Sequence, residues 1–451
     1  MSEPSQPVQG PRPPGPPTRF GPYAALSVVV ANMIGTGVFT SLGFQLLDIT
    51  SPFALLMLWV VGGVAAFCGA LTYAELGAAL PRSGGEYTFL GRIYHPAAGF
   101  ISGWVSASIG FAAPTALAAI TFGTYVRSVV PAANAALLAS ALVVIFTVVH
   151  ASTRRNSSTV QSVFTTFKVL LILTFCVAAW TLTPSPQPVP LLPDAAGLSA
   201  LTSGAFAVSL IYVSYAYTGW NAATYLTSEL ERPQRTLPWI LGLGTGLVLV
   251  LYVALNHAFL YAAPQADLVG KLEVGYVAAT HTFGARGGEI MGLVLAALLV
   301  STVSAMVLAG PRVLQVIGED YHLFRFLART NRDGIPWAAI ATQGAVSVLF
   351  ILTGSFESIL VFAGFTLGLN SFFTVLGVFV LRWRQPDLER PYRTWGYPVT
   401  PLVYLSLTLW TLAFLLVDRP QEAGLGLAIV ASGGLLYRLT GRPAKVSKDG
   451  A

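Results

Sequence analysis

Long apolar stretches separated by short polar segments dominate the pattern of this chain. Most run for about 20 residues without alternation of apolar and polar positions, which predicts helices that cross a membrane. The first half gives stretches at about 22–46, 52–80, 96–125, 132–150, 160–182 and 200–228. The second half gives about 237–262, 286–317, 335–354, 358–383, 397–416 and 423–439. The pattern therefore predicts an all-α integral membrane protein with about twelve transmembrane helices.

Composition agrees with a chain that lies in a lipid bilayer. Of 451 residues, 54% are hydrophobic and 10% are charged, whereas soluble domains carry roughly 25% charged residues. The basic residues outnumber the acidic ones but form no stripe, so we expect no nucleic-acid partner. Cys68 and Cys176 both lie in apolar stretches, which predicts neither a structural disulfide nor a metal site. We expect no cofactor.

Basic residues in the short loops predict which side of the membrane each loop faces. Placing the N-terminus in the cytoplasm puts twenty Lys and Arg residues on that side and four outside, and the last of the 25, Lys168, falls inside the fifth span. The cytoplasmic set is Arg12, Arg19, Arg82, Arg92, Arg154, Arg155, Arg232, Arg235, Arg312, Arg325, Arg329, Arg332, Arg382, Arg384, Arg390, Arg393, Arg438, Arg442, Lys445 and Lys448, and the external set is Arg127, Lys271, Arg286 and Arg419. This asymmetry predicts a multi-pass protein of the cytoplasmic membrane with both termini in the cytoplasm.

Two of the predicted spans are interrupted by polar stretches that contain glycine. The sequence GTG stands at 35–37 in the first span and TG at 218–219 in the sixth. Five spans per repeat follow, and because five is odd, the second copy enters the membrane from the opposite side, as in secondary transporters. We expect a first repeat at 21–182, a second, inverted repeat at 200–383, two further helices at 397–439, a disordered Pro-rich tail at 1–20 and a second tail at 440–451.

The first interruption offers a site for an anion. Ile34, Gly35, Thr36 and Gly37 stand in mid-span as candidate substrate contacts, and glycine allows a helix to unwind and restart. The free N–H groups and the positive dipole end of the restarted helix favour a carboxylate. The alternative is that these small residues only let two helices pack closely.

The second interruption offers acceptors for a cation. The stretch Ser214–Asn221, which contains Gly219, is polar and aromatic, and unwinding there would expose carbonyl oxygens. An ammonium group would meet these carbonyls, so the two interruptions together suit a zwitterion. Tyr215 is a candidate gate over the bound molecule. The alternative is an aromatic residue that packs without gating, since aromatic residues form 12% of the chain.

Ionisable residues inside spans are costly and therefore informative. Lys168 is expected to face the protein interior, with snorkelling to the interface as the alternative. His257 in the seventh span is a candidate for proton coupling, although an isolated histidine also serves structure. Glu75 is expected to pair with a loop arginine, and the absence of a carboxylate at mid-membrane favours neutral substrates. Walker A, HExxH, metal-ligand and nucleophile-elbow patterns do not occur, so we expect no enzyme.

Four sequence motifs carry a resemblance to a known family. They are VANMIGTGVF, AELGAALPRSGGEY, YAYTGWNAATYLTSELERPQRTLP and RPYRTWGYPVTP. Over about residues 20 to 416 the chain resembles the amino acid-polyamine-organocation family, especially the L-type branch with the light subunits of heteromeric amino acid transporters. The resemblance implies a leucine-transporter-like five-plus-five fold with alternating access, and sodium-independent exchange or facilitated transport of L-amino acids.

The resemblance also implies roles for residues. The carboxylate of the substrate would meet N–H groups at Thr36 and Gly37, and its amino group would meet carbonyls around Tyr215, Ala216 and Thr218. Lys168 matches the lysine of the fifth span in that branch. Its ammonium would replace the ion of sodium-coupled relatives, next to carbonyls near Gly35 and to hydroxyls of the eighth span, of which the candidates are Ser301 and Ser304.

Two departures from the branch affect these expectations. The external loop RSVVPAA at 127–133 has no cysteine to link a heavy chain, so we expect the chain to work alone. Phe259 stands where many relatives place a tyrosine. We predict a sodium-independent exchanger of neutral L-amino acids; the alternatives are proton-coupled uptake through Lys168 or His257, and an amino acid sensor that does not transport.

Overall fold

The computed structural model describes residues 21–440 except 83, 153–157, 194 and 231. The predicted tail at 1–20 and residues 441–451 of the second tail lie outside the described residues, as do Arg154 and Arg155. Within the described ranges the elements are helices, and no β-strand occurs. The predicted all-α class is therefore confirmed for this part of the chain.

The first half of the chain forms eight α-helices and a π-helical segment. They are α1 (Pro22–Met33), α2 (Gly37–Gln45), α3 (Pro52–Ala79), α4 (Glu86–Ile93), α5 (Pro96–Val105), η1 (Ser106–Gly110), α6 (Ala112–Val129), α7 (Ala135–Ser152) and α8 (Ser158–Leu182). Several begin where the sequence favours a helix start: proline opens α1, α3 and α5, and the Ser51 hydroxyl accepts a hydrogen bond from the N–H of Ala54.

The second half of the chain also contains long helices and shorter segments. It comprises α9 (Ala195–Leu201), α10 (Gly204–Ala216), the 3₁₀ segment η2 (Trp220–Glu229), α11 (Pro233–Ala262), α12 (Gln265–Leu268), α13 (Val274–Ala309), α14 (Pro311–Asp320), η3 (His322–Ala328), α15 (Trp337–Thr353) and α16 (Phe356–Arg384). The helices α17 (Val399–Asp418) and α18 (Pro420–Thr440) follow. The short helices α4 and α12 lie outside the predicted spans, and α9 overlaps the predicted sixth span only at residues 200 and 201.

The predicted spans agree in position with helices of the structure. Among the described residues, ten helices are long and apolar enough to cross a membrane. The pair α9 and α10, bent by 68°, provides an eleventh candidate, and α15 is a shorter apolar helix. A multi-pass membrane protein is thus supported, while the count of twelve stays a prediction.

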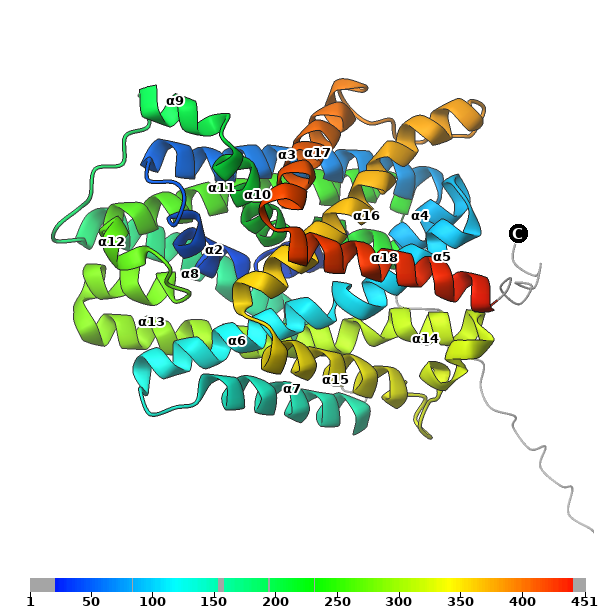
Figure 1. Ribbon diagram of the computed structural model, residues 1–451, viewed down its shortest axis with the longest axis horizontal. Helices are drawn as coiled ribbons and strands as arrows, with labels where there is room; N and C mark the ends of the chain where they lie inside the picture. Colours follow the sequence, from blue (N-terminus) through cyan, green and yellow to red (C-terminus); the bar gives the residue numbers. More distant parts are fainter. Residues whose placement is uncertain (1–20, 83, 153–157, 194, 231, 441–451) are drawn as a thin grey trace, which may run out of the picture.

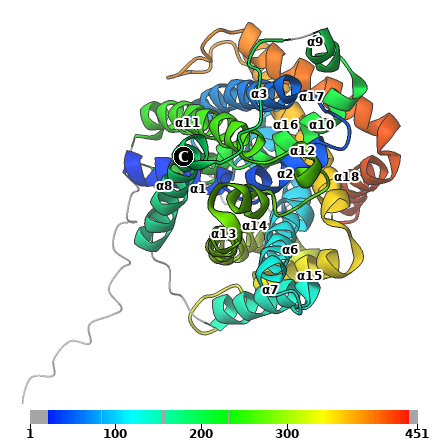
Figure 2. The ribbon, with the colours of Figure 1, turned by 90° about the vertical axis from the view of Figure 1, so that its left-hand side faces the viewer.

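The helices run roughly along the long axis of the molecule (Figure 1). The pair α3 and α11 packs on one side and the pair α7 and α15 on the opposite side, and both pairs remain together in the view along the helices (Figure 2). In the most apolar 18-residue window of Ala25–Gln45, which covers most of α1 and all of α2, 72% of the residues are buried, whereas the same share is 22% for α7 and 17% for α18. The interrupted first span therefore lies inside, and α7 and α18 present apolar faces suited to lipid.

Candidate functional site

The first span is broken where the sequence predicts. The helix α1 ends at Met33, α2 begins at Gly37, and the N–H of Gly35 donates to the Met33 carbonyl across the break (2.8 Å). Thr36 precedes α2 but its side chain makes no capping hydrogen bond. The first N–H groups of a helix have no acceptor within the helix, so those at Thr36 and Gly37 are available to an anion.

The sixth span is broken at the predicted position as well. The helix α10 ends at Ala216, and Gly219 adopts a φ of 99°, a left-handed conformation that favours glycine. The N–H and the hydroxyl of Thr218 both donate to the Tyr215 carbonyl (3.0 and 2.7 Å). The chain then continues as the 3₁₀ segment η2, so the two halves of this span are joined by an irregular turn.

The two breaks pack directly against each other. A Cβ on Gly37 would lie 2.5 Å from the Cα of Ala216, and a Cβ on Gly219 would lie 2.7 Å from the Asn32 carbonyl oxygen. Each break therefore needs a glycine where it touches the other. The Tyr252 hydroxyl of α11 reaches the carbonyls of Met33 and Ala216, the latter at 3.2 Å, and so ties the two breaks together.

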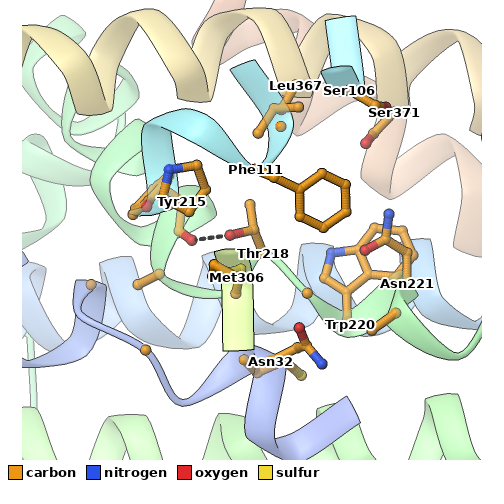
Figure 3. Close-up of a pocket in the computed structure, with 18 of the residues that line it drawn as sticks. Asn32, Ser106, Phe111, Tyr215, Thr218, Trp220, Asn221, Met306, Leu367 and Ser371 are labelled. Atoms are coloured by element: carbon orange, nitrogen blue, oxygen red, sulfur yellow. Dashed lines mark hydrogen bonds between the residues drawn. The ribbon is translucent and has the colours of Figure 1, made fainter. Parts of the chain in front are cut away.

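A cavity of about 130 Å³ opens between the breaks. Seven of the predicted site residues line it: Gly35, Thr36, Gly37, Tyr215, Ala216, Thr218 and Gly219. The remaining wall comes from other elements and includes Asn32, Glu86, Ser106, Phe111, Trp220, Asn221, Tyr225, Thr302, Met306, Leu367 and Ser371. Figure 3 shows Phe111 projecting among Thr218, Trp220 and Asn221. The cavity thus combines main-chain polar groups with an aromatic wall.

Ile34 is absent from this lining, although we predicted it as a substrate contact. Its carbonyl oxygen accepts a hydrogen bond from Nζ of Lys168 (2.9 Å). The same Nζ donates to Oγ1 of Thr302 in α13 (3.1 Å), and the Lys168 side chain is buried. Lys168 therefore joins α8, the first break and α13. The alternative, in which its side chain snorkels to the membrane interface, is wrong.

The hydroxyl partner of Lys168 was predicted wrongly as Ser301 or Ser304. Successive residues of an α-helix turn by about 100°, so neither serine shares the direction of Thr302. Ser304 instead lies 2.9 Å from Nε2 of His150 on α7. The correct partner differs by a single position from Ser301.

His257 is not brought to the cavity. Its Nδ1 accepts a hydrogen bond from Nε1 of Trp180 (3.1 Å), and its ring stacks on Tyr261. It lines an open groove with apolar residues such as Leu249 and Val253. This position lies on the outside of α11, away from both breaks, so the structure gives His257 no contact with the residues of the site.

A wider cavity of about 520 Å³ adjoins the first, because Asn32, Phe111 and Tyr225 line both. Arg82 and Arg312 stand in its wall. These two arginines belong to loops and helix ends that the charge pattern assigns to the cytoplasm. We call this second cavity the vestibule.

A hydrogen bond fixes part of the vestibule wall. The Tyr87 hydroxyl of α4 donates to the Asp320 carboxylate at the end of α14 (2.7 Å). Burial, and next the bond to Asp320, raises the pKa of the Tyr87 hydroxyl. The hydroxyl therefore stays protonated, and the tie between α4 and α14 persists at neutral pH.

Stacked aromatic rings belong to the apolar cluster that contains Tyr215. Phe44 of α2 stacks on Tyr212 and on Phe356, with ring centroids 5.8 and 5.6 Å apart. The Tyr212 hydroxyl donates to Glu357 (2.7 Å), and Arg419 donates to the same carboxylate (2.8 Å). These contacts join α2, α10 and α16 next to Tyr215.

Comparison with known families identifies the class of this protein. The family model described as "Amino acid permease" matches residues 20–429. The chain belongs to the amino acid permease family. As a permease it is an amino acid transporter and not an enzyme, which confirms the predicted family and class.

Curated relatives of the permease align over most of its length. It is 29% identical to "Large neutral amino acids transporter small subunit 2" of Mus musculus, over 93% of this chain and 80% of that relative. It is 28% identical to "Asc-type amino acid transporter 1" of Mus musculus, with the same shares covered. It is 26% identical to "b(0,+)-type amino acid transporter 1" of Mus musculus, over 92% and 86% of the two chains.

Three residues of the site were not predicted from the sequence. Phe111 follows the π-helical segment η1. Such a distortion often marks functional positions, but no sequence pattern here predicts it. Tyr252 stands seven residues before Phe259, which packs on Phe175 in the core. Glu86 lies within the motif SGGEY, which we treated as a loop.

Replacing Tyr252 by phenylalanine tests the tie between the breaks. The ring should keep its place against Trp59 and Tyr217. The Ala216 carbonyl loses its donor, and the Met33 carbonyl keeps only the N–H of Gly35. We expect the permease to be destabilised by about 1–3 kcal/mol, measured as unfolding in detergent. Tyr261→Phe, on the exterior of the same helix, is the control. A Tyr252→Phe variant as stable as the control would contradict this role.

Proposed function

We propose that the permease is a sodium-independent exchanger of neutral L-amino acids across the cytoplasmic membrane. The observation that carries the proposal is the cavity where two broken spans meet, one offering helix-start N–H groups and the other carbonyl oxygens. A zwitterion needs both kinds of partner within a few ångströms. Alternating access around such a midplane site is typical of transporters with two inverted repeats.

The hydrogen bonds already present indicate how an amino acid would bind. Its carboxylate would accept from the N–H groups of Thr36 and Gly37. A carbonyl oxygen has two lone pairs, and both at Tyr215 are occupied by Thr218. The Ala216 carbonyl accepts one hydrogen bond, from Tyr252, so it has a position left for the ammonium group.

Alternating access would open and close the two sides of the cavity in turn. We propose that the described conformation is open to the vestibule and that the stack of Phe44, Tyr212 and Phe356 closes the other side. Tyr215 lies one turn beyond Tyr212 on α10, in the wall of the cavity. We propose that Tyr215 moves with α10 and covers the bound molecule when the vestibule closes.

Lys168 supports sodium independence. Its ammonium group occupies the space between the Ile34 carbonyl and the Thr302 hydroxyl, where it would take the place of a bound sodium ion. Because the ammonium group of Lys168 is part of the protein, a co-transported sodium ion is not needed at this position. The alternative of proton coupling through His257 has less support, because that residue contacts Trp180 on the outside of the helix bundle.

We propose that the permease functions without a heavy chain. The relative with the name "Large neutral amino acids transporter small subunit 2" is by that name a subunit, but the external loop at 127–133 of this chain has no cysteine to form a covalent link. Cys68 and Cys176 lie in helices α3 and α8 as free thiols. We place both termini in the cytoplasm on the strength of the basic loops.

Transport by purified protein in liposomes tests the proposal. We expect labelled L-leucine to enter liposomes preloaded with unlabelled L-leucine much faster than empty ones, equally in sodium and in choline buffer. An imposed proton gradient should leave this rate unchanged. Uptake into empty liposomes that follows the proton gradient would support symport instead, and binding without uptake into either kind would support a sensor.

A further inference from the structure

The wall of the small cavity contains a carboxylate, that of Glu86. Glu86 is the first residue of α4 and follows Gly84 and Gly85, whose φ angles of 121° and 52° suit glycine. A Cβ on Gly85 would lie 2.6 Å from the Tyr225 ring. The two glycines therefore let the chain turn tightly against η2 and deliver the side chain of Glu86 to the site.

Neutral donors surround this carboxylate. The Tyr73 hydroxyl donates to Oε1 of Glu86 (3.1 Å), and the Tyr225 hydroxyl donates to Oε2 (2.6 Å). The Asn221 amide also donates to Oε1. Glu86 is 2% exposed, and within the described ranges no lysine, arginine or histidine forms an ion pair with it.

A second buried carboxylate shows how the same fold compensates such a charge elsewhere. Glu75 accepts hydrogen bonds from Nε and Nη2 of Arg382 (2.8 and 2.7 Å). Arg390, in the loop after α16, lies 3.7 Å away, which agrees with the predicted pairing to a loop arginine. Glu75 is thus neutralised by resident arginines. Glu86 differs because its hydrogen-bond donors are neutral, and no basic side chain of the described residues forms an ion pair with it.

The carboxylate of Glu86 keeps room for one more donor. Its two oxygens offer about four acceptor positions, of which Tyr73 and Asn221 use two on Oε1 and Tyr225 uses one on Oε2. A buried charge is stabilised strongly by an opposite charge and weakly by neutral dipoles alone. The remaining position on Oε2, at a cavity wall, therefore suits a cationic donor that enters with the substrate.

We propose that Glu86 binds the cationic side chain of amino acids such as L-lysine, so that the permease carries them in addition to neutral amino acids. This inference rests on the proposed function, because it places the zwitterionic end of the substrate at the two breaks and only its side chain at Glu86. The sequence analysis favoured neutral substrates for want of a carboxylate in the site. Glu86 supplies that carboxylate.

Competition between two related amino acids tests the proposal. L-norleucine has the four-carbon side chain of L-lysine without its ammonium group. Both compounds should inhibit labelled L-leucine exchange by the wild-type permease in liposomes. In Glu86→Gln we expect the ratio of the lysine inhibition constant to the norleucine constant to rise about tenfold or more, since a buried charge partner is lost.

Two further variants separate charge from structure. Glu86→Asp keeps the negative charge, and its ratio should lie closer to wild type than that of Glu86→Gln. Glu289→Gln removes an exposed carboxylate of α13, outside the cavity lining, and should leave the ratio unchanged. If Glu86→Gln folds poorly, the ratio measured with Glu86→Asp and wild type still tests the proposal.

The outcomes distinguish this inference from the proposed function. If wild-type permease exchanges leucine and lysine does not inhibit, the role of Glu86 is wrong and the exchanger survives. Equal effects of Glu86→Gln on lysine and norleucine would also overturn it, because they would indicate a structural role alone. If wild type exchanges no amino acid at all, the proposed function itself fails.

Discussion

Transport by the Lys168→Met variant is expected to fall at least about a hundredfold, because two hydrogen bonds from a charged donor are lost and each contributes about 1.5–3 kcal/mol. Lys168 is the contact between α8, the broken first span and α13. Without it the Ile34 carbonyl has no partner there, and the break loses the cation that holds it open. Labelled leucine exchange in liposomes measures the effect, with insertion checked by the yield of folded protein.

Two controls accompany this variant. Lys271→Met removes an exposed lysine beyond α12 and should transport normally. Thr302→Val removes only one of the two contacts of Lys168 and should give an intermediate rate. Normal exchange by folded Lys168→Met protein would show that the ammonium group is not needed for transport. It would also contradict the explanation of sodium independence.

Gly37→Val is expected to abolish both transport and amino acid binding. Even a Cβ at this position would lie 2.5 Å from Cα and 2.6 Å from Cβ of Ala216. The atoms of Ala216 belong to the second break and have little freedom to move, so the two broken spans must separate. We expect a loss of stability of about 1–3 kcal/mol, typical of overpacking, together with loss of the cavity.

Gly35→Ala is the matched control for this substitution. Its Cβ would meet only the Met33 carbonyl oxygen, 3.9 Å away. Gly35 and Gly37 belong to the same GTG motif, yet the structure predicts that a methyl group fits at one and not at the other. Thermal unfolding in detergent should separate them clearly. Equal stability of Gly35→Ala and Gly37→Val would contradict the close contact between the breaks.

The features of the fold that depend on local sequence could be predicted. Length and hydropathy determine where a helix can cross the bilayer, and the helix α3 at Pro52–Ala79 agrees with the predicted 52–80. Glycine and threonine in mid-span are likewise a local signal, so the breaks at 35–37 and 218–219 could be predicted. A charge inside a span is costly, which favoured an interior position for Lys168, and the contacts of its ammonium group decided against snorkelling.

Features that depend on two distant segments could not be predicted in the same way. Tyr252 meets Met33 across 219 positions of the chain, and Glu86 meets Asn221 across 135. Hydropathy does not give the rotation of one helix against another. The choice of Ser301 or Ser304 over Thr302 failed for this reason, since an error of one residue changes the direction of a side chain by about 100°.

The placement of an amino acid between the two breaks is tested most directly by an experimental structure of the permease with bound L-leucine. We predict density for the carboxylate within hydrogen-bonding distance, about 2.7–3.2 Å, of the N–H groups of Thr36 and Gly37. The ammonium group should contact the Ala216 carbonyl. Leucine bound outside this cavity, or bound there with its carboxylate away from Thr36 and Gly37, would contradict the account.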